Sequence, residues 1–82
     1  MNAAQCRAGR GLVNWSQERL AEAAEVSVTA LRNFERGATQ PMRRNLAALR
    51  AALEAGGVEF IEENGGGPGV RLRRAQGQPP SD

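Results

Sequence analysis

The chain has no histidine, no tyrosine and no lysine, and its 82 residues include one cysteine, one tryptophan and two phenylalanines. Without histidine or tyrosine, and with acidic residues spread singly over predicted helical surfaces, acid–base and metal chemistry lack their usual groups. The lone Cys6 cannot form an intrachain disulfide, and its place in a helical pattern predicts a core position. We therefore expect no catalytic residue, no metal site and no cofactor.

Long hydrophobic runs are also missing. No apolar stretch approaches the roughly 18 residues that a membrane span requires, and no basic-then-hydrophobic signal segment opens the chain. We expect a soluble, cytoplasmic protein that does not bind membranes. A chain of this length builds one small core, and association into oligomers is a common means of stabilising such a core.

All eleven basic residues are arginine. Arginine suits bidentate recognition of phosphate and of guanine edges, although an arginine-only composition also fits a GC-rich genome. Residues 1–55 contain eight Arg against five Glu, whereas residues 56–82 contain three Arg against three Glu and one Asp. The excess positive charge therefore lies in the first part of the chain.

Capping residues and apolar spacing predict four helices before residue 56. Asn2, Ser16 and Ser27 each stand at the N-cap of a helical pattern, and Gly37 and Gly56 follow such patterns as terminators. The predicted helices are 3–13, 17–24, 28–36 and 42–55. The tight turn between the second and third makes a helix-turn-helix, which lays a helix in the major groove of DNA.

A different pattern follows Gly57. Residues 58–61 and 70–73 are short β-type runs, separated by the turn-rich segment 64–69, and they predict a hairpin. The polar, proline-containing residues 75–82 predict a disordered tail. We therefore divide the chain into a helical unit (1–57), a hairpin (58–74) and the tail.

The motif residues resemble those of the Xre/Cro-like helix-turn-helix family over roughly residues 3–55. The resemblance is carried by Ser16-Gln17, Leu20-Ala21, Val26-Ser27, Leu31, Phe34-Glu35-Arg36-Gly37 and Pro41. It implies a mainly α, lambda-repressor-like bundle, here of four helices, with a C-terminal β-hairpin in place of the usual short fifth helix. It also implies a sequence-specific regulator of transcription that binds double-stranded DNA and is associated with the nucleoid. We favour repression.

The resemblance assigns base contacts to the third predicted helix. Val28 and the Thr29 methyl can pack on a thymine methyl group, Asn33 can bind adenine through two hydrogen bonds, and Arg32 can reach a base or the backbone. Two of these residues have plainer alternatives. Val28 can turn into the core, and Arg32 can be a solvated surface charge.

Other positions receive phosphate-binding and structural roles from the same resemblance. Gln17 lies at a helix N-terminus and Arg43 and Arg44 open the fourth helix, and all three are expected at DNA phosphates. Arg10 and Glu35 are expected to form a partly buried ion pair between the first and third helices.

The chain departs from the family pattern at two further positions. Glu25 occupies a turn position where glycine is usual, so either a non-glycine residue accepts a left-handed conformation or the turn is built differently. Met42 stands where a Ser or Thr cap is usual, so the fourth helix has a weak start.

An isolated hairpin is marginal in water, so this one needs a partner surface. It can fold back on its own helices, or it can pair with a second copy across a two-fold axis, and we favour the second arrangement. A homodimer with recognition helices one DNA turn apart, ~34 Å, would read a palindromic operator. The expected dimer residues are Val58, Phe60, Ile61, Val70 and Leu72. The rival hypothesis is an antitoxin or antiactivator that binds a regulatory protein and uses its helix-turn-helix secondarily.

Overall fold

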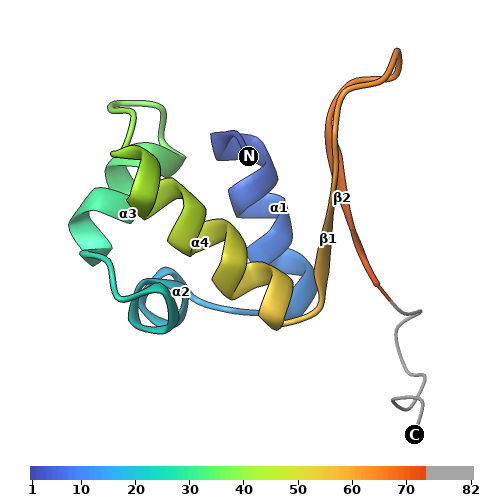
Figure 1. Cartoon of the computed structure of the whole chain (residues 1–82). Coiled ribbons are helices and arrows are strands. Elements are labelled where there is room, and N and C mark those ends of the chain that lie inside the picture. The colour runs from blue at the N-terminus through green and yellow to red at the C-terminus, as the bar shows by residue number, and fades with distance from the viewer. Residues whose placement is uncertain (74–82) are drawn as a thin grey trace, which may run out of the picture.

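The computed structural model describes residues 1–73, and it consists of four helices followed by a two-stranded hairpin (Figure 1). The tail predicted for residues 75–82 lies outside the described residues. The elements are α1 (Ala3–Val13), α2 (Gln17–Ala24), α3 (Val28–Glu35), α4 (Arg43–Ala55), β1 (Val58–Ile61) and β2 (Gly69–Leu72). The mainly helical fold with a C-terminal hairpin is as predicted.

Side-chain caps fix the starts of the first three helices. The Asn2 side-chain oxygen accepts from the Gln5 backbone N–H (2.7 Å), and the Gln5 side-chain oxygen accepts from the Asn2 backbone N–H (2.8 Å). This capping box satisfies two donors that a helix start leaves free. Ser16 and Ser27 each accept one backbone N–H from the first turn of α2 and α3.

The turn between α2 and α3 resolves the alternatives at Glu25. Glu25 adopts a left-handed conformation, with φ 59° and ψ 42°, and the next residue, Val26, donates its N–H to the Ala21 carbonyl (3.0 Å). The chain therefore keeps the ordinary geometry of the turn and accepts a strain of ~1–2 kcal/mol that glycine would avoid.

Two helix boundaries differ by one residue from those predicted. Arg36 is the C-cap of α3 and not its last residue, and Met42 precedes α4 without capping it through its side chain. Met42 is 57% exposed, whereas Leu49 and Leu53 of α4 are buried in the core.

The core lies between the helices and the inner face of the hairpin. Its fully buried side chains are Leu20, Leu31, Leu49, Leu53, Val58 and Cys6. At two positions the absence of a glycine side chain lets a large apolar side chain lie close to the backbone. A Cβ at Gly9 would lie 3.3 Å from Leu53, and a Cβ at Gly56 would lie 2.9 Å from the ring of Trp15.

The hairpin packs on its own helices, as Figure 1 shows beside α1 and α4. Its register pairs Val58 with Leu72, Glu59 with Arg71, Phe60 with Val70 and Ile61 with Gly69, so β2 begins one residue earlier than predicted. Val58 and Phe60 are buried. These two side chains belong to the core of their own chain, which corrects their expected place at a contact with a second copy.

Hydrogen bonds hold both ends of the hairpin. The Gln5 side-chain amide donates to the carbonyls of Gly69 (3.1 Å) and Ile61 (3.5 Å), which lie opposite each other next to the loop. At the other end the Arg73 N–H donates to the Gly57 carbonyl (2.9 Å). Gln5, the partner of Asn2 in the capping box of α1, therefore also anchors the hairpin.

Candidate nucleic-acid interface

Helix α3 ends in a hydrogen-bonded turn that fixes its last residues. The Ala38 N–H donates to the Asn33 carbonyl (2.9 Å), the Gly37 N–H donates to the Phe34 carbonyl (3.0 Å), and Gly37 has φ 79°. These are the two bonds of a Schellman motif, which needs a left-handed residue and is most easily made by glycine. The backbone of Asn33 and Arg36 is thereby held in place.

The buried carboxylate of Glu35, the last residue of α3, ties this helix to α1 and α2. Glu35 is 3% exposed, and the Arg10 guanidinium binds both of its oxygens at 2.7 Å from Nε and Nη2. The Gln17 amide donates to the same carboxylate at 2.9 Å, and the Cys6 thiol does so at 3.2 Å. Every helix of the helix-turn-helix, together with α1, therefore meets at Glu35.

The charges of this group follow from its contacts. Burial raises the pKa of Glu35, but the hydrogen bonds from Arg10, Gln17 and Cys6 outweigh that effect, and the net shift is downward. The hydrogen bond to Glu35 raises the pKa of Arg10. Burial, followed by the contact with Glu35, raises the pKa of the Cys6 thiol to about 12. The group is therefore a carboxylate, a guanidinium and an inert neutral thiol near pH 7.

An open cleft of about 540 Å³ lies between α1, the start of α2 and the end of α3. Four guanidinium groups line it, together with Gln17 and the single carboxylate of Glu35; the four are Arg7, Arg10, Arg32 and Arg36. The Arg7 guanidinium also donates to the Glu35 backbone carbonyl. The four arginines outnumber the Glu35 carboxylate and the neighbouring Glu18 that pairs with Arg32, so the net positive charge suits an anionic group.

Arg32 and Gln17 are bound to each other and to neighbouring acidic groups. Arg32 Nη2 lies 2.5 Å from the Glu18 carboxylate, and Arg32 Nε lies 3.4 Å from the Gln17 side-chain oxygen. Both partners of the Arg32–Glu18 pair are exposed, so water screens it and the pair is worth little. Arg32 can therefore exchange Glu18 for another anion at low cost.

The side chains expected to touch bases differ in exposure. Thr29 and Arg32 are exposed, Asn33 is half-buried, and Val28 is half-buried and packs against the core. The Asn33 side-chain oxygen accepts two hydrogen bonds from Arg36, at 2.8 Å from Nη2 and 3.2 Å from Nε. The plainer alternative, packing against the core, is therefore observed for Val28, and its contact with a base stays a prediction.

A helix-turn-helix family model matches residues 7–60, which is about two thirds of the chain. The chain belongs to the Xre/Cro-like helix-turn-helix family. Among curated proteins no sequence matches it significantly. The family is one of DNA-binding regulators, so double-stranded DNA is the partner.

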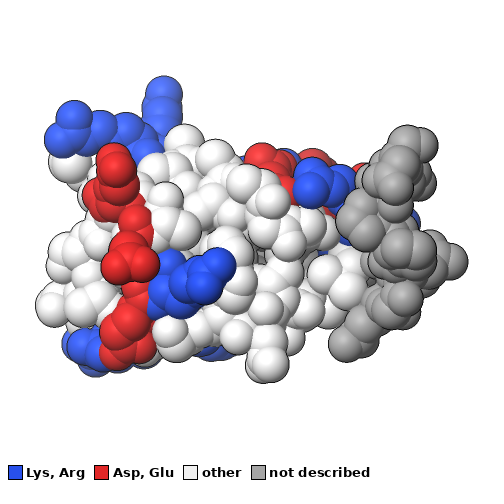
Figure 2. All heavy atoms as spheres, turned by 90° about the horizontal axis from the view of Figure 1, so that it is seen from below, with Lys and Arg blue, Asp and Glu red and all other residues white. Residues whose placement is uncertain are grey.

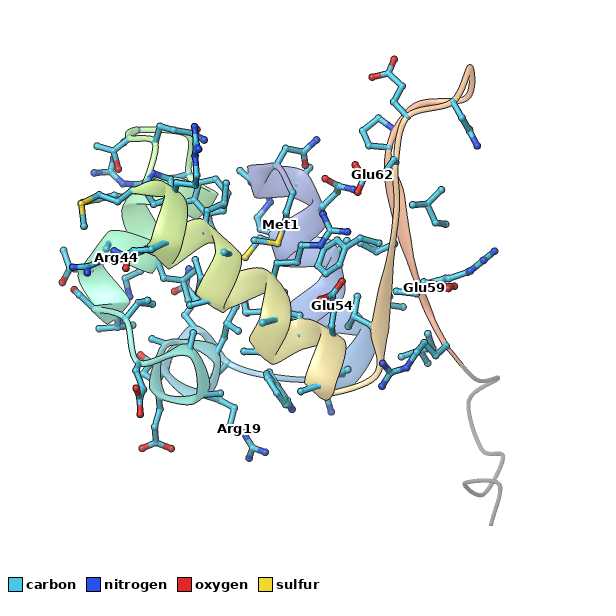
Figure 3. The ribbon with its side chains drawn as sticks, in the orientation of Figure 1. Met1, Arg19, Arg44, Glu54, Glu59 and Glu62 are labelled. Carbon is cyan, nitrogen blue, oxygen red and sulfur yellow. The ribbon has the colours of Figure 1, made fainter. Side chains whose placement is uncertain are left out.

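In this helix-turn-helix protein Arg43 and Arg44 lie at the start of α4 and are exposed. Figure 3 shows Arg44 near α3, at the end of the molecule opposite the hairpin and the labelled Glu59 and Glu62. Within residues 1–73 neither arginine takes part in a salt bridge. The contact of both arginines with DNA phosphates stays a prediction.

Figure 2 shows the side of the molecule on which α2 lies, with a row of acidic side chains and arginines beside it. The exposed acidic residues of α2 and its turn are Glu18, Glu22 and Glu25. In the described part of the chain no helix is long and apolar enough to cross a membrane.

Sequence reasoning missed Arg7, Arg36 and Glu18. The signal was present for the two arginines, because Arg7 and Arg10 are three apart on α1, and Arg32 and Arg36 span one turn at the end of α3. Residues with these spacings share a helix face. That the two faces meet across one cleft depends on how α1 crosses α3, which the spacing does not determine.

Proposed function

We propose that the protein is a transcriptional repressor that binds a palindromic operator as a homodimer, with α3 in the major groove and its site of action on the cytoplasmic nucleoid. The observation that carries this proposal is the arginine cleft directly beside the exposed face of α3. A helix in the major groove has phosphates on both sides. The cleft would bind those on one side, and Arg43 and Arg44 those on the other.

Gln17 has a modified role in this proposal. Its side-chain amide already forms hydrogen bonds with Glu35 and Arg32. A phosphate would therefore bind to the neighbouring arginines and not to the Gln17 side chain. The backbone N–H of Gln17 has no acceptor within α2, because the first N–H groups of a helix lack one. Together with the positive end of the helix dipole, this donor supports a phosphate contact by Gln17 through its backbone.

The homodimer is supported by the free edge of the hairpin. The sheet has two strands. Gly57 and Arg73 lie opposite each other in the register and are joined by a hydrogen bond between the strands. In an antiparallel ladder, hydrogen-bonded pairs alternate with pairs that are not hydrogen-bonded. Leu72 and Val70 belong to pairs of the second kind, so their backbone N–H and C=O groups point away from β1. A second copy that adds its own β2 would use these groups and leave Val58 and Phe60 in the core.

DNA binding is tested by selecting bound sequences from a random duplex pool and measuring the affinity of the selected site by fluorescence anisotropy at several salt concentrations. Replacing Arg43 and Arg44 together by glutamine should reduce the log–log salt slope by about two, since each phosphate contact contributes about 0.9. The matched control is Arg71→Gln on the hairpin, which should leave the slope unchanged. Failure to select any sequence would favour the protein-interaction module instead.

The dimer is tested by sedimentation of the intact chain and of Leu72→Pro. Proline removes the outward N–H of an edge strand without disturbing the hydrogen bonds to β1, so we expect a dimer for the wild type and a folded monomer for the variant. Truncation after Gly56 would not serve, because it removes Val58 and Phe60 from the core. An unchanged dimer in Leu72→Pro would exclude pairing through this edge.

A further inference from the structure

Asn33 and Arg36 form a joint surface at the end of the recognition helix. The guanidinium of Arg36 directs Nε and Nη2 at one atom of the Asn33 amide, at 3.2 and 2.8 Å. A guanidinium has only donors, so the atom facing it must be the amide oxygen and not the amide nitrogen. The orientation of the Asn33 amide is therefore fixed by its partner.

The backbone holds this pair together. Arg36 is the C-cap of α3, with φ −91° and ψ 5°, and the two bonds of the Schellman turn hold the residues on either side of it. The Asn33 carbonyl accepts both the Ala38 N–H (2.9 Å) and the Thr39 N–H (3.4 Å). Both members thus start from restrained backbone positions three residues apart, a spacing that brings side chains together on a helix.

The pairing changes which base Asn33 can read. A free asparagine binds adenine by accepting from N6 and donating to N7, and this needs its oxygen. Here two N–H groups of Arg36 already bind that oxygen, so the groups left unpaired within this pair, the Asn33 NH₂ and the remaining N–H groups of Arg36, are mostly donors. A surface of donors matches guanine, which presents two acceptors, N7 and O6, in the major groove.

We propose that Arg36 is a specificity-determining positioning residue, which holds the Asn33 amide so that the pair reads guanine and rejects adenine. This inference rests on the proposed function, because it requires α3 to lie in the major groove. The donor-rich surface would repel the amino groups of adenine and cytosine. Guanine should be preferred over adenine at this position by about tenfold, within the range of a good bidentate contact.

The test uses the full-length chain and selection from a random duplex pool, followed by competition between selected sites that differ at one base pair. Asn33→Ala identifies that base pair as the position whose preference is lost. At this position the wild type should select guanine. Arg36→Met keeps the length of the side chain but frees the Asn33 oxygen, so the preference should move to adenine by about tenfold.

Two further variants separate this role from simple charge. Arg36→Lys retains a donor for the Asn33 oxygen and should retain the guanine preference in weakened form. Arg71→Met removes the same charge from the hairpin and should leave the selected sequence unchanged. A uniform loss of affinity in Arg36→Met with the base preference intact would mean that Arg36 only binds phosphate, which would overturn the proposal.

The outcomes also distinguish this inference from the proposed function. Selection of a defined site with adenine at the Asn33 position would overturn the role of Arg36 and leave DNA reading by α3 intact. Selection of no site would overturn the proposed function itself and this inference with it.

Discussion

Glu35 and Glu59 each pair with an arginine, but their surroundings differ completely. Glu35 is the last residue of α3 and is 3% exposed, with Arg10, Gln17 and Cys6 around its carboxylate. Glu59 lies on the outer face of the hairpin, where it is 44% exposed and contacts Arg71, its cross-strand neighbour. The first pair joins α1 to α3 and, through Gln17, α2 as well, whereas the second joins two strands that are already hydrogen-bonded. Burial and connectivity, and not the pair itself, decide how much each contributes.

Glu35→Gln should have the largest effect on stability. The change leaves the Arg10 charge without its partner in a partly buried position, and we expect a loss of about 3 kcal/mol. The control Glu59→Gln should cost less than about 1 kcal/mol, because water screens an exposed pair. Urea unfolding followed by circular dichroism measures both. Equal losses in the two variants would contradict the contrast between the sites.

The same contrast should appear as pH dependence. The pKa of Glu35 is lowered from its ordinary value of 4.5, so the unfolded chain takes up this proton before the folded chain does. The stabilisation is therefore complete above about pH 4.5 and is lost as the pH falls through the folded value. The steeper acid destabilisation of the wild type should disappear in Glu35→Gln and persist in Glu59→Gln.

Val58→Ala and Ile61→Ala together compare the contributions of the inner and outer faces of the hairpin to stability. Val58 is fully buried, and removal of its two methyl groups should cost about 2 kcal/mol through lost burial and a residual cavity. Ile61→Ala, at a partly exposed position on the same strand, should cost clearly less. Thermal unfolding of both variants measures the difference. If Ile61→Ala were the more damaging change, the hairpin would not pack through the face described.

Two glycine substitutions should give the smallest effects, with opposite signs. Gly11→Ala places a Cβ in open space in α1 and should stabilise the protein by about 0.5–1 kcal/mol through helix propensity. Gly56→Ala places a Cβ 2.9 Å from the Trp15 ring and should destabilise it by about 1 kcal/mol or more. Thermal unfolding checks the signs, and Trp15 fluorescence should change only in Gly56→Ala.

The helical part could be predicted because its determinants are local. Asn2, Ser16 and Ser27 mark helix starts through bonds to backbone groups three residues away, and Gly37 marks a helix end through the bond of its own backbone N–H to the carbonyl three residues earlier. Such signals depend only on neighbouring residues. The helix bounds therefore agree with the structure to within one residue.

The position of the hairpin and the composition of the cleft depend on long-range contacts. Residues 58–61 predicted a strand whose hairpin needs a partner surface, and we favoured a second copy over the chain's own helices. The deciding contacts are those of Val58 with the core and of the Gln5 amide with the Gly69 carbonyl, 64 residues away. The arginine cleft was missed for the same reason, since Arg7 and Arg36 come together only after α1 and α3 pack.

The carboxylate of Glu35 also bears on how DNA would be read. Because α1 and α2 both bind it, α3 cannot tilt or slide without breaking several charged hydrogen bonds. The entropy of fixing the reading helix is therefore lost during folding and not at the moment of binding. If α3 is rigid before binding, the DNA duplex must change its shape to fit the helix. Base pairs that no side chain touches would then influence affinity through the ease with which they bend and twist.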